Sequence, residues 1–319
     1  MAGSSPSNGR SAEHSPVQVV VVGSLNMDLV VRVERLPRPG ETIAGEHFST
    51  IPGGKGANQA AAVARLGARS AMIGRVGDDA FGDQLRRSLV GFGVDVAHVA
   101  VTSECSSGVA VIGVERSGEN AITIVAGANG SLTAADVEDV EEAIAGAAVL
   151  LVQLEVPLKT VAAAVALARR HGVATVLDPA PVPAGGLPAE LFTVDVLSPN
   201  QSEAEQLTGI AAADLAGADR AARELLRRGA GRVVLKLGPE GALIVDGEGP
   251  SQHVAAFAAD VVDTTAAGDA FTAAVAVGLA EGMPLVAAVR FGCAAGALAT
   301  TVFGAQPAMP ARHRVDALL

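Results

Sequence analysis

Short apolar runs alternate with helical segments along most of the chain, and this alternation restricts the fold more than any other feature. Residues 17–22 are almost all valine and end at Gly23, which is typical of a buried strand in a parallel sheet. Further strands are predicted at 70–74, 94–101, 148–152, 174–177, 194–197 and 232–237. Helices are predicted between them at 79–89, 136–144, 159–170, 203–207 and 218–228. This spacing predicts an α/β domain with a mostly parallel sheet covered on both faces.

Two other parts of the chain do not follow this pattern. Strands predicted at 29–33 and 42–50 are half polar, and prolines and a glycine separate them. A second pair, at 108–114 and 120–125, reads as a hairpin around Arg116-Ser117-Gly118-Glu119. We expect these four strands to form a small subsheet that projects from the main body.

The composition limits the possible partners. The chain has 319 residues, half of them hydrophobic, which is enough for one large α/β domain or two average ones. Lys and Arg number 23 against 34 Asp and Glu, and this acidic balance disfavours a nucleic-acid surface. Cys105 and Cys293 are the two cysteines and form no CxxC pair, so neither a disulfide framework nor a structural zinc is expected.

No segment predicts secretion or membrane anchoring. Residues 1–16 lack the apolar core of a signal peptide and are predicted to be a disordered extension. The uncharged stretch from Phe291 contains too many Gly, Thr and Pro residues for a membrane span, so we expect a buried helix that ends near Phe303-Gly304. These features predict a cytoplasmic protein.

The strongest candidate site is the stretch from Asp263 to Phe271, where small residues stop at Asp269 and an apolar helix follows. Small side chains let a ligand approach the backbone, and the free N–H groups of a first helical turn favour an anion. Asp269 would stand where that anion meets a substrate hydroxyl, which suggests phosphoryl transfer. An ordinary loop-to-helix junction with Asp269 near an N-cap explains this segment equally well.

A second glycine-rich turn, Gly53 to Gln59, opens the predicted helix that Gly67 ends. Its glycines permit close contact with a ligand, and Asn58 projects from the first turn. The spacing matches neither the Walker P-loop nor the dinucleotide-binding GxGxxG motif. By itself this turn is a weak signal.

Polar residues follow several predicted strands, at the edge where open α/β sheets bind ligands. Asn26 and Asp28 are two residues apart, so in extended backbone they face the same way and suit the hydroxyls of a polyol. An Asx-turn explains these two residues as well. Glu155 also follows a predicted strand at this edge, and a solvated acid at a strand end is the alternative explanation for it. Asn200 and Glu203 share a helix face that suits Mg²⁺ held through water and phosphate, or a helix cap. The turn 238–241 can wrap an adenine or simply reverse the chain.

The order of these motifs along the chain resembles the ribokinase/PfkB family of carbohydrate kinases. The resemblance covers residues 17–319, and the two glycine-bearing motifs, GGKGANQA and DTTAAGDAF, are specific when found together. The ribokinase branch of the family is the most similar, on the residues 23–28, 53–60 and 304–307.

The resemblance implies ATP-dependent phosphorylation of D-ribose at the 5-hydroxyl, giving D-ribose 5-phosphate and ADP. It implies a three-layer αβα sandwich over residues 17–319, with a lid from about 28–50 and 107–126 that also forms a homodimer contact. The cofactors implied are Mg²⁺ and a monovalent cation, usually K⁺.

The resemblance also implies roles for individual residues. Asp269 matches the catalytic base. The anion hole matches Ala266, Ala267 and Gly268. The sugar contacts match Asn26, Asp28, Gly54, Lys55, Asn58 and Glu155. The nucleotide region matches Asn200, Glu203, Lys236, Gly238, Gly241, Gly268 and Cys293. The monovalent cation site matches Asp263, Thr265, Ala299, Val302, Gly304 and Ala308.

Three positions depart from the pattern of the family. Ala308 stands where a serine hydroxyl often faces the cation, and Cys293 stands where a histidine can lie beside the base. Lys236 occupies a position that is often threonine, so it is either an added charge near the phosphates or a surface lysine.

Rival functions remain open at this point. Another kinase of the family could act on fructose, a nucleoside or a sugar phosphate, and a silent sugar- or nucleotide-sensing protein is the alternative from a different class. The chain has no Trp, no Tyr and only 8 Phe to wall a nucleobase. Lys55 is the one basic residue inside the sugar motifs, and the intact Gly268-Asp269 pair argues against a silent protein.

Overall fold

The computed structural model describes residues 18–319; the predicted disordered extension at 1–16 lies outside these residues. A nine-stranded sheet has the order β13-β12-β11-β10-β9-β8-β1-β4-β5. The strands from β11 to β5 run parallel, and β12 and β13 add an antiparallel edge. The bounds are β1 Gln18–Val22, β4 Arg69–Gly77, β5 Asp95–Thr102, β8 Val149–Val152, β9 Ala174–Leu177, β10 Val196–Leu197, β11 Arg232–Lys236, β12 Ala242–Val245 and β13 Gln252–Val254.

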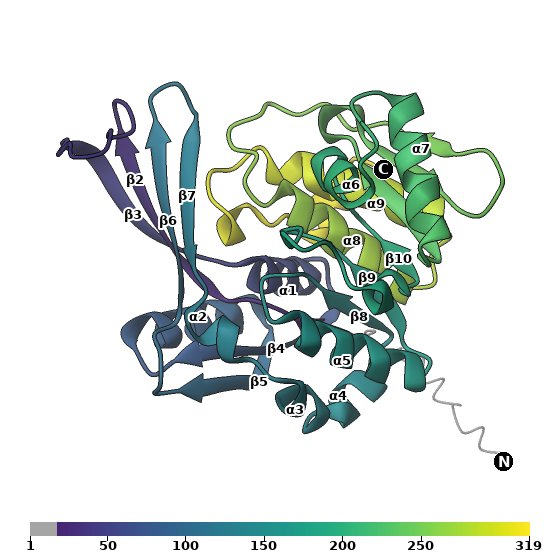
Figure 1. The fold of residues 1–319 in the computed structure, drawn as a ribbon, viewed down its shortest axis with the longest axis horizontal. Helices are drawn as coiled ribbons and strands as arrows, with labels where there is room; N and C mark the ends of the chain where they lie inside the picture. Colours follow the sequence, from purple (N-terminus) through teal and green to yellow (C-terminus); the bar gives the residue numbers. More distant parts are fainter. Residues whose placement is uncertain (1–17) are drawn as a thin grey trace, which may run out of the picture.

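Helices cover both faces of this sheet (Figure 1), as the alternation in the sequence predicts. Val19 and Val21 of the central strand join one hydrophobic core, while Val20 and Val22 join the other. One face carries α1 Lys55–Arg65, α2 Ala80–Phe92, α8 Ala267–Ala280, α9 Leu285–Ala299 and α10 Arg312–Asp316. The opposite face carries α3 Ala134–Glu138, α4 Glu141–Ala145, α5 Leu158–Arg170, α6 Gln201–Thr208 and α7 Leu215–Arg227.

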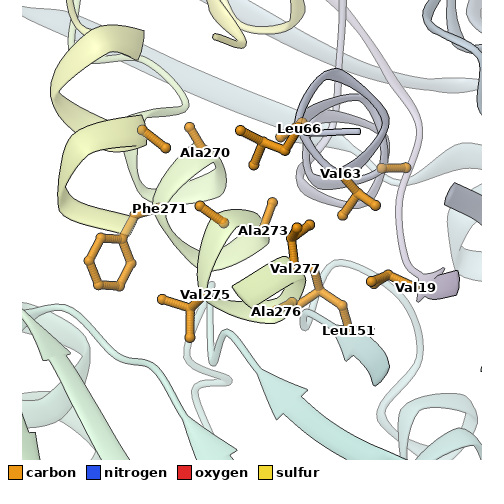
Figure 2. Packing of buried hydrophobic residues seen from close by; sticks show 14 of the residues in the cluster. Val19, Val63, Leu66, Leu151, Ala270, Phe271, Ala273, Val275, Ala276 and Val277 are labelled. Carbon is orange, nitrogen blue, oxygen red and sulfur yellow. The ribbon is translucent and has the colours of Figure 1, made fainter. Parts of the chain in front are cut away.

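The helix that follows Asp269 is apolar all round, and the structure buries it accordingly. Figure 2 shows Ala270, Ala273 and Val277 of α8 beside Val63 of α1 and Leu66, the residue that follows α1. On another side α8 meets α9 so closely that a Cβ on its Gly278 would stand 2.8 Å from Cβ of Ala288. This dense packing fixes the first turn of α8 relative to the sheet.

The four strands of the projecting subsheet form a separate sheet in the order β3-β2-β6-β7. They are β2 Asn26–Val33, β3 Gly45–Gly53, β6 Gly108–Glu115 and β7 Asn120–Val125. β2 and β6 run parallel, and the two outer pairs are antiparallel. In Figure 1 this sheet, called the lid below, stands away from the main body. The predicted fold class is therefore confirmed.

Three details differ from the sequence prediction. The helix expected at 136–144 is two short helices, because the backbone leaves the helical region at Val140. The strands β12 and β13 were not predicted. The last buried helix ends at Ala299, before the expected Phe303-Gly304, because the carbonyl of Thr300 accepts from the N–H groups of Val262 and Asp263 at 2.8 and 3.1 Å. Within residues 18–319, no helix has both the length and the apolar character needed to cross a bilayer.

Candidate active site

The site lies where the carboxyl ends of the parallel strands meet the first turns of three helices. The strands β1, β8, β9, β10 and β11 pair in parallel, so their carboxyl ends share one edge of the sheet. Side chains from the starts of α1, α6 and α8 converge there, and the contacts below join them to the strand ends.

Asp269 is held rigidly in the first turn of α8, with 4% of its surface exposed. Nδ2 of Asn58 donates to its Oδ2 over 2.9 Å, and Nε2 of Gln59 donates to its Oδ1 over 3.1 Å. Burial raises the pKa of Asp269 above its ordinary value, although the nearby Lys55 ammonium opposes this shift. One carboxylate is thus oriented by two amides from α1 and kept close to a cation.

Gln59 extends this contact into a buried network that the sequence analysis did not include. Its Nε2 also donates to Oδ2 of Asp178 over 3.0 Å, and its Oε1 accepts from Nε2 of Gln153. Nζ of Lys236 donates to Oδ1 of Asp178 over 2.7 Å. Two signals could have found these residues: Gln59 follows Asn58 inside the glycine motif, and Gln153 and Asp178 follow buried strands.

The turn between β3 and α1 shows why the glycine motif is required. Gly54 has φ of 90°, and a Cβ there would stand 2.6 Å from the backbone nitrogen of Asn26. A Cβ on Gly53 would stand 2.3 Å from Oδ2 of Asp28. The motif is therefore packed directly against the two polar residues at the start of β2.

Three further polar residues join the same corner. Oε2 of Glu155 accepts from the backbone nitrogen of Lys55 over 3.1 Å and from the hydroxyl of Ser24. Nδ2 of Asn129 donates to Oδ1 of Asn26 over 2.7 Å, so the oxygen of that amide already has a partner. Neither Ser24 nor Asn129 was predicted as a site residue.

The charges of this corner are strongly coupled. Burial, with Glu155 and Asp269 close by, raises the pKa of Asp28 to about 7. Burial lowers the pKa of Lys55, but Asp269, Asp178 and Glu155 outweigh it and raise that pKa above its ordinary value. The carboxylates thus keep Lys55 charged and make ionisation of Asp28 costly.

The first turn of α8 begins in an unusual backbone conformation. Within residues 18–319, Ala266 is the one non-glycine residue with positive φ, at 58°. The N–H of Ala267 is turned toward the carbonyl of Thr264 at 3.3 Å, so an anion would compete with that bond. A Cβ on Gly268 would stand 4.0 Å from Nζ of Lys236, which places an ammonium group next to this turn.

Asn200 and Glu203 form the helix cap that their spacing allows. Oδ1 of Asn200 accepts from the backbone nitrogen of Glu203 over 2.8 Å, and Oε2 of Glu203 accepts from the backbone nitrogen of Asn200 over 2.7 Å. Burial raises the pKa of Glu203, while the nearby Lys236 opposes that shift. The cap therefore lies beside the Lys236–Asp178 pair.

The predicted nucleotide turn and Cys293 come together at β13. Gly241 has φ of 99°, and a Cβ there would stand 2.1 Å from the carbonyl oxygen of Val254. The thiol of Cys293 lies 3.9 Å from the same oxygen, and burial raises its pKa to about 11. In the described part of the chain this contact turns the thiol toward β13, and no contact places it beside Asp269.

A loop of the expected cation-site residues lies next to the start of α8. Oδ1 of Asp263 accepts from the hydroxyl of Thr265 over 2.7 Å, and its Oδ2 accepts from the backbone nitrogen of Gly304 over 2.9 Å. Burial acts to raise the pKa of Asp263, but these hydrogen bonds hold that pKa below its ordinary value. Ala299 and Val302 lie in the same turn, and Ala308 is buried close to it.

The lid reaches this loop as well. The Arg32 guanidinium of β2 stands 5.4 Å from the centre of the Phe303 ring, within cation–π range. Between residues 18 and 319 no group of three or more His, Cys, Asp or Glu side chains is placed to hold a metal ion.

Comparison with known proteins decides the family. The model of the pfkB family of carbohydrate kinases matches residues 17–312. The chain belongs to this family. Two pfkB-family relatives are the ribokinase of Haemophilus influenzae, 40% identical over 92% of this chain and 96% of the relative, and the ribokinase of Schizosaccharomyces pombe, 41% identical over 94% and 97%.

Solved structures of pfkB-family kinases have the same fold. The Arabidopsis thaliana ribokinase complexed with ribose and ATP superposes with a TM-score of 0.89 at 36% identity, covering 95% of this chain and 98% of that one. The Thermotoga maritima ribokinase superposes with a TM-score of 0.83, also at 36% identity, over 95% and 99%.

Proposed function

We propose that this chain transfers the γ-phosphoryl group of ATP to the 5-hydroxyl of D-ribose, giving D-ribose 5-phosphate and ADP. One observation carries the proposal: Asp269 is oriented by Asn58 and Gln59 at the start of α8, beside the polar corner of Asn26, Asp28 and Glu155. The relatives named ribokinase, at about two-fifths identity over nearly the whole chain, support the choice of sugar.

The polar corner would hold the sugar. Free carboxylate lone pairs of Asp28 and Glu155 would accept hydrogen bonds from the sugar hydroxyls. The amide hydrogens of Asn26 would donate to the sugar, and those of Asn58 orient Asp269. Because Gly53 and Gly54 have no Cβ, Asp28 and Asn26 can pack directly against the turn between β3 and α1. This arrangement would direct the 5-hydroxyl toward Asp269.

Asp269 would orient that hydroxyl and take its proton. A carboxylate of ordinary pKa about 3.9 is a far weaker base than an alkoxide, so the proton leaves late, as oxygen bonds to phosphorus. Burial raises the pKa of Asp269 and so improves the match. The N–H groups at the start of α8 would stabilise the charge on the phosphoryl group in transit.

Mg²⁺ would accompany the nucleotide at Asn200 and Glu203. The residues fit this role because a carboxylate and an amide oxygen are ligands that Mg²⁺ accepts through water. Burial raises the pKa of Glu203, and the negative charge of Asp178 adds to this shift, so a cation is favoured beside these carboxylates. When bound, the ion would neutralise phosphate charge.

The loop that contains Asp263 would hold K⁺. Its donors are of the right kind, since an ionised carboxylate and backbone carbonyl oxygens suit hard cations. The low pKa of Asp263 keeps that carboxylate charged. Ala308 supplies no side-chain oxygen, so the shell would rely on the carboxylate and the carbonyls of Ala299, Val302 and Gly304.

The enzyme would act in the cytoplasm.

The lid would form the contact of a homodimer. Several large apolar side chains of the lid are at least 45% exposed, which is unusual for a surface that meets only water. They are Phe48, Val111, Ile122, Ile124 and Val125. Covering them with a second lid would remove both the apolar surface and the open strand edges.

A coupled assay of ADP release tests the function. We expect D-ribose to support turnover with Mg²⁺, and K⁺ to increase it. D-Fructose, nucleosides and 5-deoxy-D-ribose are the comparisons, and the last of these lacks the acceptor hydroxyl. Faster turnover with fructose or a nucleoside would assign another sugar kinase, and sugar binding without ADP release would assign a sensing protein.

A further inference from the structure

Lys236 stands at the point where the phosphates of the nucleotide should meet the start of α8. It ends β11, and its side chain is only 12% exposed while that of Asp178 is 2% exposed. Nζ lies 2.7 Å from Oδ1 of Asp178 and 4.0 Å from the position that a Cβ on Gly268 would occupy. An ammonium group is therefore fixed between a carboxylate and the first turn of a helix.

This position is unfavourable for a cation unless an anion arrives. The start of a helix carries partial positive charge, so it repels an ammonium group and attracts a phosphate. Asp178 compensates by pairing with the ammonium, but that bond uses one of its three donors. The other two can reach an anion bound at Gly268.

The ammonium group of Lys236 offsets part of a large negative charge in the site. Five carboxylates line the site against two lysines, and ATP adds further negative charge. The carboxylates are Asp28, Glu155, Asp178, Glu203 and Asp269, and the lysines are Lys55 and Lys236. The chain has one other lysine, Lys159, which is exposed on α5.

Asp178 can hold Lys236 through one oxygen while its other oxygen stays bonded to the buried network. Its second oxygen, Oδ2, accepts from Nε2 of Gln59, which also donates to Asp269. Asp178 therefore keeps an amide partner whatever Lys236 binds. The same amide links the position of the lysine to the orientation of the base.

We propose that Lys236 is a further catalytic residue, which binds the β- and γ-phosphate oxygens of ATP at Gly268, and that Asp178 is its positioning residue. This inference rests on the proposed kinase function. The alternative is that Lys236 and Asp178 form a structural ion pair, in which the lysine only neutralises the buried carboxylate.

A variant with uncharged side chains at both positions distinguishes phosphate binding from a structural ion pair. Lys236→Met alone leaves Asp178 buried without its cation, so the double variant Asp178→Asn, Lys236→Met is the decisive one: it removes both charges together. The carbonyl oxygen of the new asparagine can still accept from Gln59, and methionine fills the space of the lysine stem. Lys159→Met is the matched control, because it removes a lysine whose side chain is exposed on α5.

We expect kcat/KM for ATP to fall by about 10- to 100-fold in the double variant, the range of a lost charge-assisted hydrogen bond, with KM for ribose little changed. The second readout is nucleotide affinity without turnover. Calorimetry with Mg²⁺ and a non-hydrolysable ATP analogue should show a similar loss, while AMP, which lacks the β- and γ-phosphates, should bind as in the unmodified protein.

Wild-type kcat/KM for ATP in the double variant, or equal losses for AMP and the ATP analogue, would overturn the proposal. If the double variant does not fold, ¹⁵N NMR of the three lysine ammonium groups in the unmodified protein takes its place. The Lys236 signal should shift with the ATP analogue and not with AMP, and no difference between them would again overturn the proposal. These binding measurements need no ribose, so they remain decisive even if the sugar assignment is wrong.

Discussion

Nδ2 of Asn58 donates a hydrogen bond to Oδ2 of Asp269 over 2.9 Å, although the two residues are 211 positions apart in the sequence. Each lies in the first turn of its helix, one in α1 and the other in α8. The bond therefore joins the two glycine-bearing motifs and orients the carboxylate relative to the polar corner. The proposed catalysis would depend on that orientation.

Replacing Asn58 with alanine should lower kcat/KM for ribose by about 10- to 100-fold, because a hydrogen bond to a charged group is lost. Steady-state kinetics with varied ribose measures the change. The matched control is Gln206→Ala, which removes an exposed amide on α6. Equal kinetics for the two variants would show that Asn58 does not orient the base.

The activity should depend on the ionisation of Asp28. Its pKa is raised from 3.8 to about 7, so the carboxyl group is protonated below pH 7 and becomes a carboxylate above it. Sugar hydroxyls need the carboxylate as acceptor, so kcat/KM for ribose should fall about tenfold per pH unit below pH 7. Asp28→Asn should remove this dependence, and an unchanged profile in that variant would assign the titration to another group.

Asp28 should also affect stability, with a definite sign. Between about pH 4 and pH 7 the folded state holds a proton that the unfolded state has lost, so its contribution to stability falls as the pH rises through this range. Asp28→Asn should therefore have a higher melting temperature than the unmodified protein at pH 8 but not at pH 4. The opposite order at the two pH values would contradict the raised pKa.

Gly54→Ala should reduce both stability and sugar affinity. Alanine at positive φ costs about 1–2 kcal/mol, and its Cβ would also press on the backbone nitrogen of Asn26. Gly67→Ala is the control, since Gly67 also has φ of 90° but no atom lies within 4 Å of its Cβ position. Thermal melts should show a loss in both variants, and ribose titrations a loss only at Gly54. Normal ribose affinity in Gly54→Ala would show that this turn does not shape the sugar site.

Asp263→Ala should abolish activation by K⁺, because it removes the one charged ligand proposed for that loop. Ala308→Ser is the complementary change, since it adds a hydroxyl beside the same loop and should lower the K⁺ concentration needed for half-activation. Both are measured by titrating K⁺ at constant ionic strength. Unaltered K⁺ dependence in Asp263→Ala would place the cation elsewhere.

The sequence predicted the fold well because the valine-rich strands and amphipathic helices are local patterns. The antiparallel edge was missed, since β12 and β13 are only four and three residues long. The end of α9 was also misplaced, because Thr300 turns its carbonyl toward a loop that lies 37 residues earlier, at Asp263.

Within the candidate site, the sequence identified residues carried by motifs and missed those that act through long-range contacts. Asp269, Asn58 and Glu155 stand in recognisable motifs or at strand ends. Gln59 and Asp178 become part of the site only when α1, β9 and α8 pack together, because one Gln59 amide bonds both carboxylates. A hydrogen bond of this kind leaves no periodic pattern in the chain.

The most direct test of the account is the turnover of Asp269→Asn, measured together with its affinity for ribose. Asparagine keeps the shape of the side chain but cannot take the proton, so kcat should fall by at least ~100-fold. Ribose binding by calorimetry should stay within about threefold of the unmodified protein, a difference below ~0.7 kcal/mol. A folded Asp269→Asn protein that phosphorylates ribose at a near-normal rate would contradict the account.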